Sequence, residues 1–110
     1  MSEFLYLYRG GDRAQSPAEM QQQMQRWMAW LKELGAKGHI KDQGHPLERT
    51  GKLVRGKGVT DGPFAEKDLV GGYSLIDAAD LAEAVELSKG CPIHAFNGAV
   101  EVRPIMKSNM

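Results

Sequence analysis

The segment FLYLY, from Phe4 to Tyr8, carries an apolar or aromatic side chain at every position. Successive side chains of a β-strand point to opposite faces of a sheet, so this pattern predicts a strand that is buried on both faces. The segment LVGGYSLI, from Leu69 to Ile76, predicts a second central strand, in which Gly71 and Gly72 mark a bulge or a close backbone approach. Both strands therefore require cover on each side of the sheet.

A long amphipathic helix is expected after the first strand. Ser16 is suited to the N-cap, Pro17 to the first helical position, and Glu19 lies three residues after the cap. Apolar residues then recur at three- and four-residue steps at Met20, Met24, Trp27, Met28, Leu31 and Leu34. Gly35 is expected to end this helix in the left-handed conformation.

The remaining elements are shorter. Gly38–Lys41 and Gly51–Arg55 are predicted to be strands of a loose hairpin, joined by a polar connection. Asp77 is expected to cap a second helix that Gly90 ends. The alternating segment Ala99–Met106 predicts the last strand.

The order of these elements is strand, helix, two strands or more, helix, strand. It predicts an α+β fold of the ferredoxin-like βαββαβ type, an antiparallel sheet with two helices on one face. This arrangement leaves the second face of the sheet bare, although the central strands carry apolar side chains there. Two copies packed face to face would cover both sheets, so we expect a homodimer that forms an α/β barrel.

Composition limits the class of protein. The chain has 110 residues, of which 42% are hydrophobic and 25% charged, as in one globular domain spanning residues 1–110. Fourteen basic residues balance 14 acidic ones, which argues against binding to nucleic acid or to an anionic membrane. A single cysteine, Cys91, suits a reducing compartment, and the first residues resemble a strand rather than a signal peptide. We therefore expect a cytoplasmic protein that does not enter a membrane.

Several motifs resemble those of the DGPF-containing, YCII-related proteins. VTDGPFAE, which begins at Val59 and is followed by a charged linker and GGY, is the most specific of them when VEVRPIM follows downstream. The likeness also covers LYRGGD, GHPL, GGYSLIDAADLAEAVELSKGCP and GAVEVRPIM, and thus nearly the whole chain.

The resemblance implies a dimeric ferredoxin-like barrel. Related proteins thought to be enzymes carry a histidine on the first helix, shortly before an LK-x-L segment, paired with an aspartate. Trp27 occupies that position here, and an indole cannot accept a proton as a general base. The resemblance therefore does not supply a histidine–aspartate dyad of that type. Some members are linked by gene neighbourhood to alternative sigma factors, and the resemblance therefore implies a connection to transcription.

The DGPF motif itself is a candidate site. Gly62 and Pro63 stiffen the loop that holds Asp61 and Phe64. Asp61 is a candidate catalytic base or ligand anchor, and Phe64 a candidate wall of a pocket near the dimer interface. The alternatives are that Asp61 caps a turn and that Phe64 fills the core or the dimer seam.

Other polar residues are candidate partners for Asp61. His94 is a candidate catalytic residue, and His45 a candidate ligand-binding residue, although a surface role suits either histidine. Arg9 and Arg103 are candidate binders of an anionic ligand. Arg103 also suits an ion pair with Glu101 on the sheet surface, and Arg9 has the same ambiguity. No clustered ligand spacing predicts a metal site, and no motif predicts a cofactor.

Two functions follow from these features. The first is a small-molecule-binding protein or acid–base enzyme that uses a pocket at the DGPF loop. The second is a non-catalytic regulatory or protein-interaction module in which this loop contacts a partner. The sequence does not decide whether the chain is an enzyme.

Overall fold

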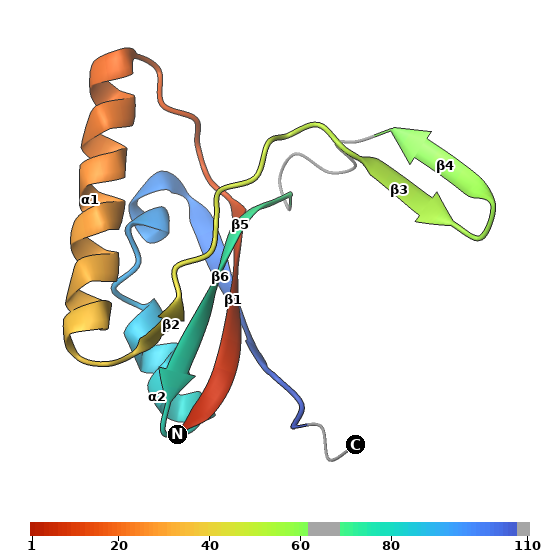
Figure 1. Cartoon of the computed structure of the whole chain (residues 1–110). Helices are drawn as coiled ribbons and strands as arrows, with labels where there is room; N and C mark the ends of the chain where they lie inside the picture. Colours follow the sequence, from red (N-terminus) through yellow and green to blue (C-terminus); the bar gives the residue numbers. More distant parts are fainter. Residues whose placement is uncertain (62–68, 108–110) are drawn as a thin grey trace.

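β1 (Ser2–Gly10) and β5 (Val70–Ala78) form the centre of the sheet in a computed structural model that describes residues 1–61 and 69–107. The other elements are α1 (Pro17–Ala36), β2 (Ile40–Asp42), β3 (Lys52–Arg55), β4 (Gly58–Asp61), α2 (Leu81–Ser88), the 3-10 helix η1 (Pro92–Phe96) and β6 (Gly98–Pro104). Within the described residues, four strands form an antiparallel sheet in the order β2-β5-β1-β6. α1 and α2 lie on one face of it (Figure 1), so the α+β, ferredoxin-like prediction is confirmed.

The core lies between this face and the helices. Phe4, Tyr6 and Tyr8 of β1 point toward the helices, where Tyr6 is 0% exposed. The Tyr6 ring stacks on Trp30 of α1 with 6.2 Å between centroids, and its hydroxyl donates to the backbone carbonyl of Ala84 in α2. One buried aromatic residue of the central strand therefore holds both helices to the sheet.

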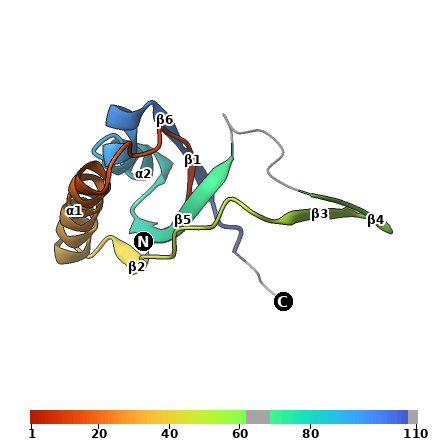
Figure 2. The same cartoon turned by 90° about the horizontal axis from the view of Figure 1, so that it is seen from above.

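The opposite face, here called the open face, is not covered by any described helix. Figure 2 shows α1 and α2 on one side of the sheet only. The centre of the open face consists of Leu5 and Leu7 of β1, which pair in register with Leu75 and Tyr73 of β5. The apolar residues predicted to be buried on both faces are thus buried on the helical face and partly exposed on the open face.

The helix boundaries were predicted in part. Ser16 caps α1, since its hydroxyl accepts a hydrogen bond from the Glu19 backbone N–H at 3.1 Å. The prediction that Gly35 ends this helix is wrong, because the helix continues to Ala36 and Gly38 takes the left-handed conformation with φ of 81°.

The start of α2 also differs from the prediction. Asp80 is the N-cap, and its carboxylate accepts from the Glu83 N–H at 2.9 Å. Asp77 does not cap the helix, because β5 continues through Ala78, which pairs with Ser2 at the start of β1. β5 therefore includes the position where the helix was expected to begin, because the residues there form ladder hydrogen bonds with β1.

The predicted hairpin between Gly38–Lys41 and Gly51–Arg55 is wrong. β2 instead pairs with β5 at the edge of the sheet, with Ile40 opposite Ile76. β3 pairs with β4 across a tight turn at Gly56, where φ is 61°. This β3–β4 hairpin, residues 52–61, is here called the arm; it projects from the body on the side away from α1 and α2 (Figures 1 and 2).

Candidate functional site

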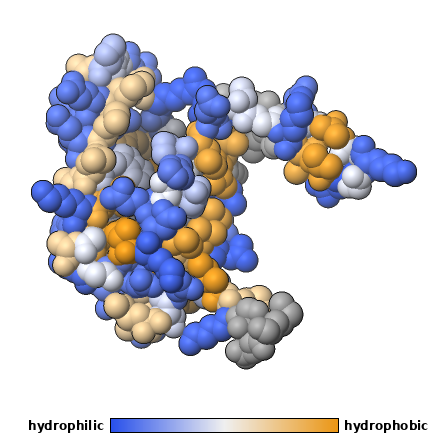
Figure 3. All heavy atoms as spheres, viewed as in Figure 1, coloured by the Kyte–Doolittle hydropathy of each residue, from blue (hydrophilic) through white to orange (hydrophobic). Residues whose placement is uncertain are grey.

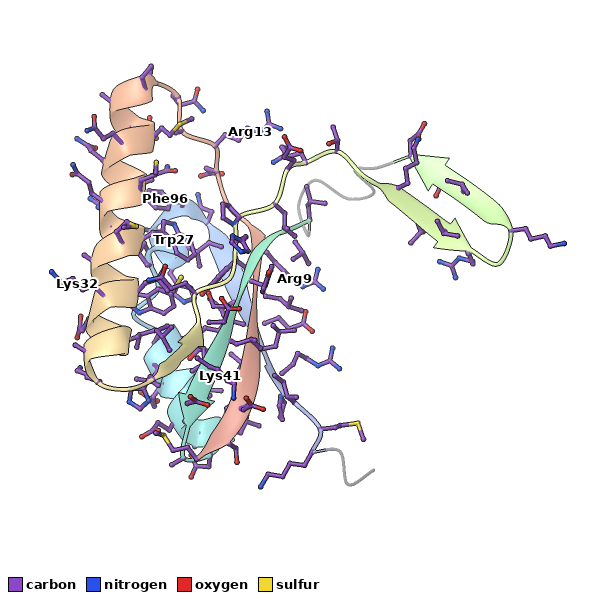
Figure 4. All side chains as sticks on the ribbon, viewed as in Figure 1. Arg9, Arg13, Trp27, Lys32, Lys41 and Phe96 are labelled. Atoms are coloured by element: carbon purple, nitrogen blue, oxygen red, sulfur yellow. The ribbon has the colours of Figure 1, made fainter. Side chains whose placement is uncertain are left out.

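A cavity of about 450 Å³ lies between α1 and the end of the sheet where β1 finishes and β5 begins. One wall is the apolar face of α1, with Met24, Trp27, Met28 and Leu31. These residues belong to the periodic set that predicts the helix, so the same pattern that forms the helix also forms the wall. In Figure 4, Trp27 points from α1 toward the sheet.

The opposite wall carries a short chain of hydrogen bonds. The Tyr8 hydroxyl donates to Ser74 Oγ at 2.8 Å, and Ser74 Oγ donates to the Gln43 carbonyl at 2.6 Å. Burial, the larger cause, raises the pKa of Tyr8 above its ordinary value although the Ser74 hydrogen bond lowers it. Tyr8 therefore presents a neutral phenol to the cavity near neutral pH, and its oxygen can accept a hydrogen bond from a ligand.

His45 lines the cavity, on a segment that is fixed against β5. The His45 carbonyl accepts from the Tyr73 N–H at 3.3 Å, and Leu47 N–H donates to the Gly71 carbonyl at 2.8 Å. At Gly72, a Cβ atom would lie 3.2 Å from the His45 carbonyl oxygen. The close backbone approach predicted for Gly71 and Gly72 is thus confirmed, and it positions an imidazole beside the cavity.

Gln23 adds an unused hydrogen-bond donor. Its side chain lines the cavity, and its Nε2 atom is buried without a hydrogen-bond partner among the described residues. A buried donor without a partner costs about 1–3 kcal/mol, a cost that the Gln23 side chain would recover by turning toward a ligand acceptor in the cavity. Gln23 lies four residues before Trp27 and so shares its helix face. This spacing is the sequence signal that could have predicted Gln23 as a lining residue.

Trp27 faces the cavity at the position where the resemblance places a histidine in related proteins. Its ring packs edge-on against Tyr8, with 4.6 Å between centroids. Asp12 also lines the cavity, and its carboxylate accepts a hydrogen bond from Asn97 Nδ2 at 2.6 Å. The described lining thus combines aromatic and apolar walls with few polar groups. His45 supplies the imidazole among them.

The residues predicted to form the site are dispersed. Of those that the structure describes, His45 alone lines the cavity. Asp61 ends β4 on the arm, where its side chain is 80% exposed and pairs with Lys52. His94 is exposed, and its Nε2 lies 3.0 Å from the Ser88 carbonyl at the end of α2. Phe64 lies outside the described residues.

Arg9 and Arg103 lie on the open face, outside the cavity. Arg9 Nε lies 2.6 Å from one carboxylate oxygen of Glu101, and Arg103 lies 3.2 Å from the other. Hydrogen bonds from Arg9 and then Arg103 hold the pKa of Glu101 below its ordinary value. Figure 4 shows Arg9 pointing away from α1. The alternative interpretation of Arg103, an ion pair on the sheet surface, is the arrangement observed.

Cys91 is buried in the core, and burial raises the pKa of its thiol to about 12. The thiol therefore stays protonated at neutral pH and is unsuited to nucleophilic attack. Across residues 1–61 and 69–107, no three His, Cys, Asp or Glu side chains gather closely enough to hold a metal ion. No helix in the same ranges is both long and apolar enough to cross a bilayer.

Comparisons with solved structures, curated proteins and family models relate this chain to known proteins. One solved structure is similar over 96% of this chain and 95% of its own, with a TM-score of 0.54 and 23% sequence identity. It is the 5-chloro-2-hydroxyhydroquinone dehydrochlorinase TftG from Burkholderia phenoliruptrix AC1100, in complex with 2,5-dihydroxybenzoquinone. A comparison with curated proteins finds no match. The model of the YCII-related domain matches residues 4–109, and the chain therefore belongs to the YCII-related family.

Proposed function

We propose that this protein binds a small cyclic molecule with polar ring substituents in the cavity between α1 and the sheet. The observation that carries the proposal is the lining: apolar and aromatic residues form most of the walls, and Tyr8, Gln23 and His45 are among the few residues that can hydrogen-bond a ligand. A cavity of about 450 Å³ is within the range of small-molecule sites. Aromatic side chains such as Trp27 favour a flat ligand, which they can contact over a large area.

The chemistry we propose is proton transfer, with His45 as the acid–base group. Histidine is the side chain that enzymes use most often for general acid–base catalysis, and His45 is the histidine in the described lining. Trp27 cannot serve as a base and Tyr8 stays protonated, which leaves them to position the ligand. TftG is a dehydrochlorinase with a bound hydroxyquinone, so 2,5-dihydroxybenzoquinone, hereafter the quinone probe, is a suitable first ligand.

The finer assignments from the sequence belong to this proposal. We place the chain in the DGPF-containing subgroup on the basis of VTDGPFAE, as a single cytoplasmic domain over residues 1–110 that does not bind nucleic acid. The catalytic roles of Asp61 and His94 and the ligand contacts of Phe64, Arg9 and Arg103 stay predictions.

The open face supports the proposed homodimer. Its apolar centre on β1 and β5 has Lys41 paired with Glu3 toward one edge and Arg9 paired with Glu101 toward the other. An apolar centre with a charged rim is the usual anatomy of a protein interface. A twofold axis through this face would bring the apolar centres of two copies together.

Calorimetric titration with the quinone probe tests the proposed function. We expect saturable binding, and we expect His45→Ala to raise the dissociation constant about tenfold, because it removes a hydrogen bond between ligand and imidazole. His94→Ala is the matched control, since His94 lies outside the cavity. The proposal would be contradicted if His94→Ala weakened binding as much as His45→Ala does. It would also be contradicted if neither the quinone probe nor dihydroxybenzenes bound.

Gln23→Met should have opposite effects on stability and on binding. It removes the unpartnered Nε2 donor, so the free energy of unfolding should rise by about 1 kcal/mol while the quinone probe binds more weakly. Chemical denaturation and titration measure the two quantities. Gln21→Met is the control, because Gln21 is exposed on the same helix and does not line the cavity. A loss of stability with unchanged affinity would show that Gln23 is a packing residue only.

A further inference from the structure

We infer that the arm of one copy packs against the body of a second copy of this chain; this rests on the homodimer proposed above. The arm is a hairpin whose strands are four residues long, and it projects from the body on the side of the open face. A lone hairpin is marginally stable in water and needs packing on a further surface.

Exposed apolar side chains mark the face of the arm that requires cover. Val54 and Val59 lie opposite each other in register, so their side chains share one face of the hairpin. They are 66% and 57% exposed, and no described part of the body covers them. Figure 3 shows hydrophobic side chains on the arm and along the body, on either side of a hollow.

The length of the arm identifies the second copy as the occupant of this hollow. Two sheets packed face to face lie about 10 Å apart, whereas a four-residue strand spans about 13 Å. An arm that leaves one body on the open-face side must therefore extend beside the partner's sheet once the open faces meet.

Charge favours the same contact. The arm carries Lys52, Arg55 and Lys57 against Asp61, a formal charge of 3 − 1 = +2. The rest of the chain then carries 11 basic and 13 acidic residues, a formal charge of −2. The arm of one copy and the body of another thus attract each other, and the two arms repel.

The dimer dissociation constant, measured by sedimentation, tests the inference. The double variant Val54→Thr and Val59→Thr keeps β-branched side chains and removes the apolar contact. We therefore expect its dimer dissociation constant to be at least about tenfold higher than that of the wild type. Leu53→Thr is the matched control, because Leu53 lies on the other face of the arm and should change the constant less than about twofold. Equal constants for the double variant and the wild type would overturn the inference.

Hydrogen exchange separates arm docking from dimerisation. Amides of residues 52–61 should be protected in the wild-type dimer and should lose that protection on dilution to monomer. A dimer with an arm that exchanges as fast as in the monomer would refute the arm contact and leave the sheet-face dimer intact. A wild-type chain that is monomeric would refute both, whereas binding of the quinone probe reports separately on the cavity.

Discussion

Gly44→Ala should lower the free energy of unfolding by about 3 kcal/mol or more, an effect at the upper end for single substitutions. Gly44 has φ of 71°, a region that alanine adopts at a cost, and its carboxyl-side neighbour is His45. A Cβ atom there would lie 1.8 Å from the Tyr73 carbonyl oxygen, so the backbone of β5 or of the 44–47 segment must move. We therefore expect the quinone probe to lose its affinity together with the stability.

Gly38→Ala is the control that isolates the backbone cost. Gly38 has φ of 81°, but a Cβ atom there would meet nothing within 4 Å. Its loss of stability should be about 1–2 kcal/mol, the cost of the left-handed conformation alone. Thermal and urea denaturation of both variants measure the difference. Equal losses in the two variants would mean that the 44–47 segment is not held tightly against β5.

Leu7→Lys should convert the dimer to a monomer. Leu7 lies at the centre of the open face on β1, where a partner sheet would bury the lysine charge. Within one copy the lysine can pair with Glu101, which lies opposite in β6, so the fold should persist. Because a twofold interface contains each substitution twice, we expect the dissociation constant to rise by a factor of about 100 or more, which corresponds to about 2.8 kcal/mol or more of lost dimer stability.

Leu81→Lys provides the matched comparison for sedimentation. Leu81 is an exposed leucine of α2, on the opposite side of the sheet from the open face. We expect it to leave the dimer unchanged. A dimer that survives Leu7→Lys but dissociates with Leu81→Lys would place the interface on the helical side of the molecule.

Long, strongly patterned elements of the fold could be predicted from the sequence. The apolar run in β1, the cap at Ser16 and the helical spacing of α1 each act locally, and each lies where expected. The hairpin partner of Gly51–Arg55 could not be predicted from such short segments. Its pairing depends on the tight turn at Gly56, whose signal competes with a longer connection to Gly38–Lys41.

The candidate site was predicted less completely, for a physical reason. The cavity forms where α1 packs over the end of β1 and β5, and the contacts of Gln23, Tyr8 and Ser74 depend on that packing. The capacity of histidine for proton transfer suggested His45 but equally His94, and the stiffness of the DGPF motif favoured Asp61; neither His94 nor Asp61 lines the cavity. The stiffness that Gly and Pro give to a sequence motif does not determine which part of the protein lies next to it.

A small cyclic ligand should bind in the cavity between α1 and the sheet. Two-dimensional amide NMR during titration with the quinone probe tests it most directly. We expect saturable shifts at the amides of Gly10, Gly11, Gly44 and Gly72, which line the cavity, with little change in the arm. Shifts confined to residues 52–61, or none at all, would contradict the claim and favour a protein-interaction module.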